Sequence, residues 1–296
     1  TGVEELLGER WSGQRERIRS RSKHAAEAGE GWDCANLIVK SFDDLRQDHF
    51  AAQLLTEFDN IFKREGLPLP LRPYAVLATC CDGGLLETLT DACSIATLKN
   101  RLRAAAPHKG AATLVDVFAT MFGRSSERCR DAQRNFVRSM SAYSVFCYVL
   151  QVKDRHNSNI LLCRDGSVAH VDFGILLNMR FAKDMIETTM KLSSEFVQVM
   201  GDQFDVFRSL CVEGYLAIRR HWERLMMLLE MSQIAKGSGL PCLEGDACEK
   251  LRGRLKLEAS EAEAALHMGR VVDAARENVR TDILDAIHGW THSNVS

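Results

Sequence analysis

The sequence has no run of apolar residues that approaches the roughly 20 needed to cross a bilayer as a helix. Its best apolar stretch, residues 145–150, is short and typical of a buried helix. Any membrane contact is therefore expected to be peripheral. The first 20 residues are strongly charged and predict no targeting signal. Because the chain begins with Thr1 rather than Met, we expect it to have been cut from a longer protein.

An excess of positive charge is also missing. Lysine and arginine number 38 against 40 acidic residues, a net charge of -2, so we predict no nucleic-acid partner. The ten cysteines include no Cys-x-x-Cys pair and lie mostly in apolar segments. They predict reduced thiols rather than a zinc site. Internal repeats and low-complexity tracts are absent, and the length of 296 residues suggests about two domains or one two-lobed domain.

The order of periodic patterns indicates a small mixed lobe followed by a larger helical one. Apolar runs at residues 36–40, 74–79 and 85–89 predict strands. Ser41 with Asp44 three residues later predicts the start of a long helix, and Gly66 predicts its end. Helices are also expected near residues 9–19, over 98–151 and from 194 to 290. The long helix has one apolar face, made by Ala51, Leu54, Leu55, Phe58, Ile61 and Phe62.

Residues 153–174 combine groups that suit phosphoryl transfer. They are predicted to form a polar loop, a strand, an Asp-Gly turn, a second strand and an Asp-Phe-Gly triplet that begins at Asp172. A hairpin brings its outer ends together, so Asn159 should lie near Asp172. Both offer the hard oxygen ligands that suit Mg²⁺. Asp154 and His156, on the loop before, are placed to orient or deprotonate a substrate hydroxyl. A single Asp or His in a loop is usually solvated, and only the combination carries the prediction.

The order Asp-Arg-His at 154–156 differs from the His-Arg-Asp of protein kinases and resembles the phosphatidylinositol 3- and 4-kinase superfamily. Residues 38–48 (IVKSFDDLRQD) are similar to another pattern of that family. The similarity continues through residues 133–137, 147–157, 191–197 and 239–242 and covers the chain from about residue 11 to 290. Within the superfamily, the chain resembles the type III beta phosphatidylinositol 4-kinases.

This resemblance implies an α+β, two-lobed kinase fold. Residues 1–89 would form the N-lobe, an antiparallel sheet plus a helix that ends in the hinge. Residues 90–296 would form a larger, mainly helical C-lobe with the catalytic loop and activation segment. The implied reaction transfers a phosphoryl group from ATP, with Mg²⁺, to the 4-hydroxyl of phosphatidylinositol in a membrane. The implied location is cytoplasmic and peripheral, on Golgi membranes.

The resemblance also assigns roles to residues. Lys40 would contact the ATP phosphates and act in catalysis with Asp154 and His156, the histidine as base or transition-state stabiliser. Asn159 and Asp172 would bind Mg²⁺. The deep adenine pocket and the hinge would be formed by Asp48, Tyr74, Glu87, Thr88 and Leu89.

Two positions depart from the family pattern. Phe42 stands where the family usually has glycine, which would alter the loop that enters the long helix. The phosphate-covering loop, commonly Ser-Pro-Tyr-Gly, corresponds here to residues 22–25 (SKHA). The metal-binding and catalytic residues are all present, so a pseudokinase is not predicted.

Substrate choice is predicted from the segment after the Asp-Phe-Gly triplet. Its only bases up to residue 191 are Arg180, Lys183 and Lys191, whereas extra phosphates on the inositol ring would need more of them. Unphosphorylated phosphatidylinositol is therefore the expected substrate. The alternatives are a phosphatidylinositol 3-kinase acting on the same lipid and a non-catalytic scaffold with the same fold.

The last predicted helix carries an apolar stripe. Its residues recur every three or four positions and end at an aromatic ring suited to a headgroup interface: Val272, Ala275, Val279, Ile283, Ala286 and Trp290. We predict a peripheral membrane contact through this helix. The open alternative is that the stripe packs onto the helical lobe.

Overall fold

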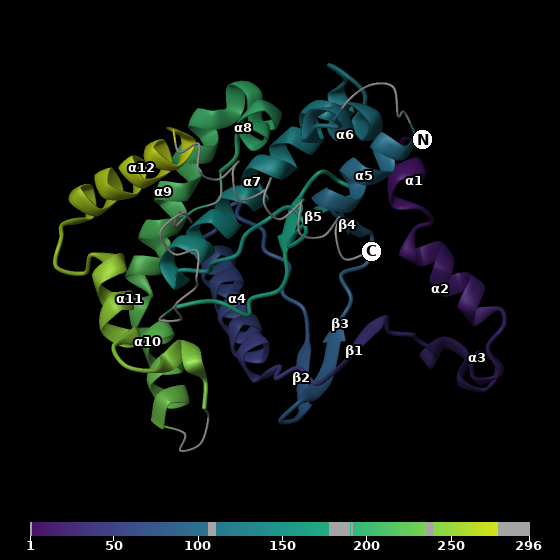
Figure 1. Ribbon diagram of the computed structural model, residues 1–296, viewed down its shortest axis with the longest axis horizontal. Helices are drawn as coiled ribbons and strands as arrows, with labels where there is room; N and C mark the ends of the chain where they lie inside the picture. Colours follow the sequence, from purple (N-terminus) through teal and green to yellow (C-terminus); the bar gives the residue numbers. More distant parts are fainter. Residues whose placement is uncertain (1, 106–110, 178–189, 191, 235–238, 278–296) are drawn as a thin grey trace.

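Figure 1 shows the computed structural model, which describes residues 2–105, 111–177, 190, 192–234 and 239–277. The fold is α+β: two small antiparallel sheets lie among many helices, in agreement with the expected two-lobed kinase fold. The described residues include no helix that is both long enough and apolar enough to span a membrane.

The first sheet has the strand order β1-β3-β2 and is antiparallel throughout. Its strands are β1 (Leu37–Ser41), β2 (Val76–Cys80) and β3 (Gly83–Glu87). The three predicted strands are thus confirmed to within two residues at each end. Because β3 stops at Glu87, the next two residues leave the sheet and lead into the second lobe.

Helix α4 (Arg46–Arg64) packs against this sheet and presents its predicted apolar face to the core. The side chains of that face are at most 1% exposed. The predicted helix start was wrong. Ser41 is the last residue of β1, paired with Gly83, and the N-cap position is Leu45. Strand pairing prevails over the local capping signature, so that residues 42–45 form a loop before the helix.

The second sheet has the order β4-β5-β6. Its strands are β4 (Ala92–Ser94), β5 (Ile160–Cys163) and β6 (Val168–His170). The β5–β6 pair is the predicted hairpin, and its turn needs glycine. Gly166 has φ 87°, and a Cβ atom there would lie 2.6 Å from the carbonyl oxygen of Ala132. The hairpin is thereby held closely against helix α7 (Glu127–Leu150).

The remaining helices surround α7, which is buried along most of its length. Helix α9 lies against α7, and α12 lies against α9 (Figure 1). Their bounds are α5 (Ile95–Ala105), α6 (Leu114–Phe122), α8 (Ser194–Met200), α9 (Phe204–Arg220), α10 (Trp222–Ile234), α11 (Ala247–Leu255) and α12 (Glu261–Glu277). Before the first sheet lie α1 (Gly2–Leu7), α2 (Trp11–Arg19) and α3 (Lys23–Ala28).

All ten cysteines are free thiols, as predicted. Four of them are buried, namely Cys147, Cys163, Cys211 and Cys242, whereas Cys80, the last residue of β2, and Cys81, which follows it, are exposed. Burial raises the pKa of the Cys242 thiol to about 12, so this side chain behaves as a small apolar group.

Candidate active site

A cavity of about 640 Å³ opens between the two sheets. Its wall is formed by β1, the start of α4, the segment after β3, strand β4 and the Asp-Phe-Gly triplet. Seven of the residues singled out from the sequence line it: Lys40, Asp48, Tyr74, Glu87, Thr88, Leu89 and Asp172. These seven residues come from four separate stretches of chain and meet at one cavity of a size that suits a small-molecule ligand.

The end of the cavity near α4 holds two carboxyl groups. Asp48 accepts a hydrogen bond from the backbone N–H of Phe173 at 3.2 Å. Burial and the nearby charge of Asp172 raise the pKa of Asp48 to about 6. The Tyr74 ring stacks on Phe173 with 6.4 Å between centroids, and burial raises the pKa of its hydroxyl. This wall is thus a packed unit that fixes the position of the Asp-Phe-Gly triplet.

Lys40 lies on β1 at the mouth of this end. Its ammonium group is 3.2 Å from a carboxylate oxygen of Asp43, and both side chains are about half exposed. A half-exposed ion pair of this kind contributes little to stability, about 0.2–1 kcal/mol. Lys40 can therefore exchange Asp43 for a phosphate at little cost to the fold.

The segment after β3 offers backbone groups to the cavity. The N–H of Glu87 donates to Ala75 at 2.8 Å, and the N–H of Thr88 donates to Asn36 at 2.9 Å. Among the described residues, none accepts a hydrogen bond from the N–H of Leu89. Of the three predicted hinge residues, Leu89 is therefore the one whose N–H has no acceptor among the described residues.

The loop at 153–159 runs beside the Asp-Phe-Gly triplet without lining the cavity wall. The carbonyl of Asn159 accepts from the N–H of Val171 at 3.1 Å, and the N–H of Lys153 donates to Ile175 at 3.0 Å. The predicted closeness of Asn159 to the start of the triplet is thus present in the backbone. Arg180, Lys183 and Lys191, predicted to face the lipid, lie outside the described residues.

Arg155 was missed as a functional residue. Its buried guanidinium donates to the carbonyls of Val171, at 2.8 Å, and of Asp172, and lies 5.3 Å from the centroid of the Phe173 ring. Gln47 was missed too: its amide donates to the carbonyl of Gly174. Both side chains hold the backbone of the triplet. The sequence showed the two residues inside motifs but gave no sign of their backbone partners.

The contacts of the His156 ring bear on its two predicted roles, base or transition-state stabiliser. The imidazole is buried, and its Nδ1 accepts a hydrogen bond from the N–H of Ser158 at 3.2 Å. In the neutral ring the proton is therefore on Nε2, 3.7 Å from a carboxylate oxygen of Asp154. A ring of this tautomer donates through Nε2, which suits a transition-state stabiliser better than a base.

The oxygens expected to hold Mg²⁺ fit that ion. The Nδ2 of Asn159 donates to the carbonyl of Asp154 at 3.1 Å, which identifies Oδ1 as the oxygen available to a ligand. Asp172 is exposed at the cavity wall and has φ 61°, which turns the chain sharply there. One carboxylate and one amide oxygen are a hard donor set of the size that Mg²⁺ uses together with nucleotide phosphates.

The two departures from the family pattern have structural counterparts. Phe42 has φ 59° and is 94% exposed. A left-handed backbone explains why glycine is usual there, and full exposure lets the phenylalanine avoid a clash. Residues 22–25 begin helix α3, where the Ser22 hydroxyl accepts from the N–H of Ala25. Among the described residues, none before Ile38 lines the cavity.

A larger hollow, about 1220 Å³, lies between the ends of α9, α11 and α12 and contains none of the predicted residues. Its basic groups serve the fold. Arg219 donates to the carbonyls of Lys256, at 3.2 Å, and Leu257, and Arg220 pairs with Glu65 at 2.5 Å. The smaller cavity between the sheets, which seven of the predicted residues line, is therefore the candidate active site.

Residues 35–245 match the family described as phosphatidylinositol 3- and 4-kinase. The chain belongs to this family, and the cavity with its Asp-Phe-Gly wall lies within the matched segment.

Among similar proteins, phosphatidylinositol 4-kinase beta 1 of Arabidopsis thaliana is 39% identical over 93% of this chain. The phosphatidylinositol 4-kinase of Dictyostelium discoideum is 35% identical over 96%, and phosphatidylinositol 4-kinase beta of Xenopus tropicalis is 35% identical over 97%. The chain spans 25%, 24% and 35% of the length of these three relatives, respectively.

Proposed function

We propose that this chain transfers the γ-phosphate of ATP to the 4-hydroxyl of phosphatidylinositol. The observation that carries the proposal is the single cavity lined by Lys40, the segment 87–89 and Asp172, with the loop of Asp154 and His156 beside it. Relatives named phosphatidylinositol 4-kinase, similar over nearly the whole chain, support the choice of lipid and ring position.

In the proposed complex, adenine lies against the hinge and the phosphates extend toward Lys40 and Asp172. Leu89 would donate its N–H to the ring, and Asp48 and Tyr74 would close the deep end. Asn159 and Asp172 would hold Mg²⁺, which neutralises phosphate charge and supports an in-line transfer when bound. Lys40 would place a positive charge on the phosphates as a point contact.

The acceptor hydroxyl would approach from the side of the loop 154–159. Asp154 is the group able to accept its proton, and His156 would donate from Nε2 to the charge that develops in the transition state. Arg155 and Gln47 would act indirectly, by holding the backbone around Asp172. A 3-kinase remains the rival enzyme, because ring position depends on pocket shape. A scaffold would not need this full set of polar groups.

Substrate choice gives a direct experiment. Phosphatidylinositol should be phosphorylated at least about tenfold faster than its monophosphates, because an added phosphate finds few cationic partners in residues 175–191. The test is initial rates on vesicles that differ only in the headgroup of the substrate lipid. Equal or faster rates on phosphatidylinositol 4-phosphate would contradict the proposed substrate.

We also propose a peripheral membrane contact through the segment that follows α12, on the cytoplasmic side of Golgi membranes as the family resemblance implies. Within α12, Val272 and Ala275 are buried, and the helix lies against α9, so this part of the stripe belongs to the core. The other stripe residues, Val279, Ile283, Ala286 and Trp290, lie outside the described residues.

Truncation after Thr281 tests that contact. If the segment serves the membrane, phosphorylation of lipid in vesicles should fall by about tenfold or more, because the apolar burial that holds the enzyme at the bilayer is lost. ATP hydrolysis in the absence of lipid should survive. A parallel loss of hydrolysis and of the thermal unfolding transition would instead assign the segment to the core.

We place the boundary between the lobes at residues 89–90. In support, residues up to Glu87 pair within the first sheet and residues from Ala92 pair within the second. Limited proteolysis tests the boundary: cleavage confined to residues 88–91 in the absence of nucleotide would agree with it, and protection of this stretch beside cleavage elsewhere would not.

A further inference from the structure

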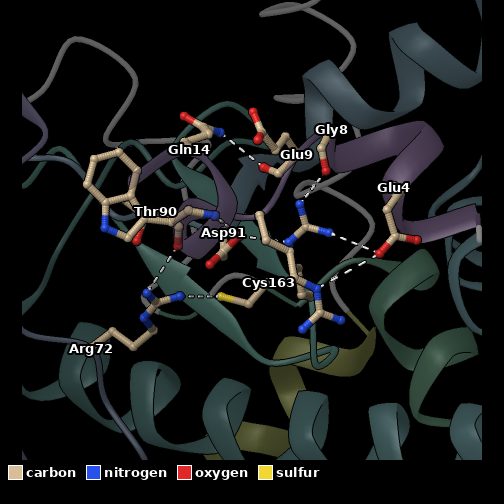
Figure 2. Close-up of polar contacts among 11 residues, drawn as sticks. Glu4, Gly8, Glu9, Gln14, Arg72, Thr90, Asp91 and Cys163 are labelled. Atoms are coloured by element: carbon tan, nitrogen blue, oxygen red, sulfur yellow. Dashed lines mark hydrogen bonds and ion pairs between the residues drawn. The ribbon is translucent and has the colours of Figure 1, made fainter. Parts of the chain in front are cut away.

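The segment that leaves the first sheet is held by hydrogen bonds immediately after the proposed hinge. Arg72 donates to the carbonyl of Thr90 at 3.3 Å and to the sulfur of Cys163 at 3.0 Å. The N–H of Arg164 donates to the carbonyl of Asp91 at 3.2 Å. Figure 2 shows these contacts around Thr90 and Asp91. The chain entering β4 is therefore fixed by side chains and backbone from two other parts of the molecule.

The side chain of Asp91 joins three segments. Its Oδ1 accepts from Arg164 Nε at 2.8 Å and from the backbone N–H of Trp11 at 3.1 Å. Trp11 is the first residue of α2, and its N-cap residue Arg10 makes no side-chain cap. A helix leaves its first N–H groups without partners inside the helix. Asp91, just past the hinge, therefore caps the N-terminus of α2.

Charge and backbone geometry both mark Asp91 as a constrained position. Burial alone would raise the pKa of Asp91, but the hydrogen bonds from Arg164 and Trp11 outweigh it and hold that pKa below its ordinary value. Its φ of 58° is left-handed, a conformation that Asp tolerates better than most side chains but that still needs support.

The helix that precedes α2 is anchored in the second lobe. Val3 and Leu6 are buried, and the carbonyl of Leu6 accepts from Arg101 on α5 at 2.6 Å. The carbonyl of Gly8 accepts from Arg164, and Glu4 lies 3.8 Å from the same guanidinium (Figure 2). Helix α1 is thus a fixed support, to which Asp91 is tied through Arg164 and α2.

The same segment returns to the hinge from the other side. After α2 and α3 the chain reaches Asn36, whose carbonyl accepts from the N–H of Thr88, next to Leu89. Residues 2–36 therefore contact the hinge itself at Thr88, through Asn36, and the segment just past the hinge at Asp91, through Trp11. These two contacts lie on either side of Leu89.

We infer that residues 2–19 act as a brace for the nucleotide-binding hinge, with Asp91 as the positioning residue that connects them. The inference rests on the proposed function, because it assumes that adenine binds residues 87–89. Asp91 lines no part of the cavity and acts through the hinge backbone. When the hydrogen bonds of Asp91 are lost, a smaller fraction of molecules has the Leu89 N–H in the position that binds adenine. ATP affinity then falls in proportion to that fraction.

Two substitutions weaken the contact between Asp91 and α2, one at the acceptor and one at the donor. Asp91→Asn keeps the tolerance for positive φ but removes the charge that faces Arg164. Trp11→Pro removes the donated backbone N–H together with the indole ring, and proline is favoured at the first position of a helix. The extended ψ of 148° at Arg10 suits a following proline. Trp11→Ala is the matched control, because it loses the ring and keeps the N–H.

The variants are compared in the intact chain by ATP kinetics, by direct binding of a fluorescent ATP analogue and by hydrogen–deuterium exchange. Asp91→Asn and Trp11→Pro should raise KM and Kd for ATP about five- to tenfold, the size expected for the loss of one ordinary hydrogen bond. Their kcat should stay within about twofold, and exchange at residues 87–94 should become faster. Trp11→Ala should behave as wild type, as should Glu230→Gln, which breaks an exposed ion pair with Arg252.

Unchanged ATP affinity and hinge exchange in folded Asp91→Asn and Trp11→Pro would overturn the inference. A fall in kcat, ATP affinity and melting temperature together would also overturn it, since residues 2–19 would then be general stabilisers. Nucleotide binding is measured without lipid, so a chain that fails to phosphorylate phosphatidylinositol leaves this readout intact. The two failures can therefore be told apart.

Discussion

The Asp172→Asn variant is expected to lose activity by about two orders of magnitude or more, the cost of removing a preorganised electrostatic contact. Asp172 lies exposed at the cavity wall, and its carboxylate is the one charged ligand in the proposed Mg²⁺ pair. Asparagine keeps the shape and tolerates the φ of 61°, so the substitution changes the charge and little else. The measurement is lipid phosphorylation at saturating Mg²⁺ and ATP.

The control for this variant is Asp131→Asn, which removes an exposed carboxylate of α7 from its pair with Arg134. It should retain full activity. The melting temperature of both variants should remain close to that of the wild type. A folded Asp172→Asn enzyme with near-normal turnover would refute the assignment of this residue to the metal.

The Lys40→Met variant should lose phosphoryl transfer, by about 10²–10³-fold, because the phosphates lose a preorganised positive charge. Its melting temperature should change little, because the ion pair with Asp43 is half exposed. The measurements are single-turnover phosphorylation of lipid and thermal unfolding without nucleotide.

A close control exists on α11. Lys250 pairs with Asp246 at 3.0 Å, and the Lys250 side chain is 47% exposed. The Lys40–Asp43 distance is 3.2 Å, and the Lys40 side chain is 45% exposed. Lys250→Met should therefore match Lys40→Met in stability and retain activity. A large loss of stability in Lys40→Met, with normal activity per folded molecule, would make Lys40 a structural residue.

Local pattern was enough to predict the strands, the buried face of α4 and the β5–β6 hairpin. The closeness of Asn159 to Asp172 followed from that hairpin alone. Local pattern failed at Ser41, where cross-strand pairing with Gly83 extends the strand past a capping signature. Whether Ser41 ends a strand or caps a helix depends on its pairing partner Gly83, more than 40 positions away. A short sequence window does not contain that partner.

The supports of the site could not be predicted because their partners are backbone atoms. Gln47 binds the carbonyl of Gly174, which lies 127 residues away in the sequence. Arg155 binds the carbonyl of Asp172, which lies 17 residues away. A carbonyl is present at every position, so the sequence gives no sign of which one is bound. The contact of Trp11 with Asp91 is hidden for the same reason, since it uses a backbone N–H.

The position of the transferred phosphate tests the central claim most directly. The chain is incubated with labelled ATP, Mg²⁺ and vesicles of phosphatidylinositol, and the lipid products are separated by ring isomer. We predict phosphatidylinositol 4-phosphate as the product with wild-type chain and almost none with Asp172→Asn. Phosphatidylinositol 3-phosphate as the product, or no lipid product from a chain that binds ATP normally, would contradict the proposal.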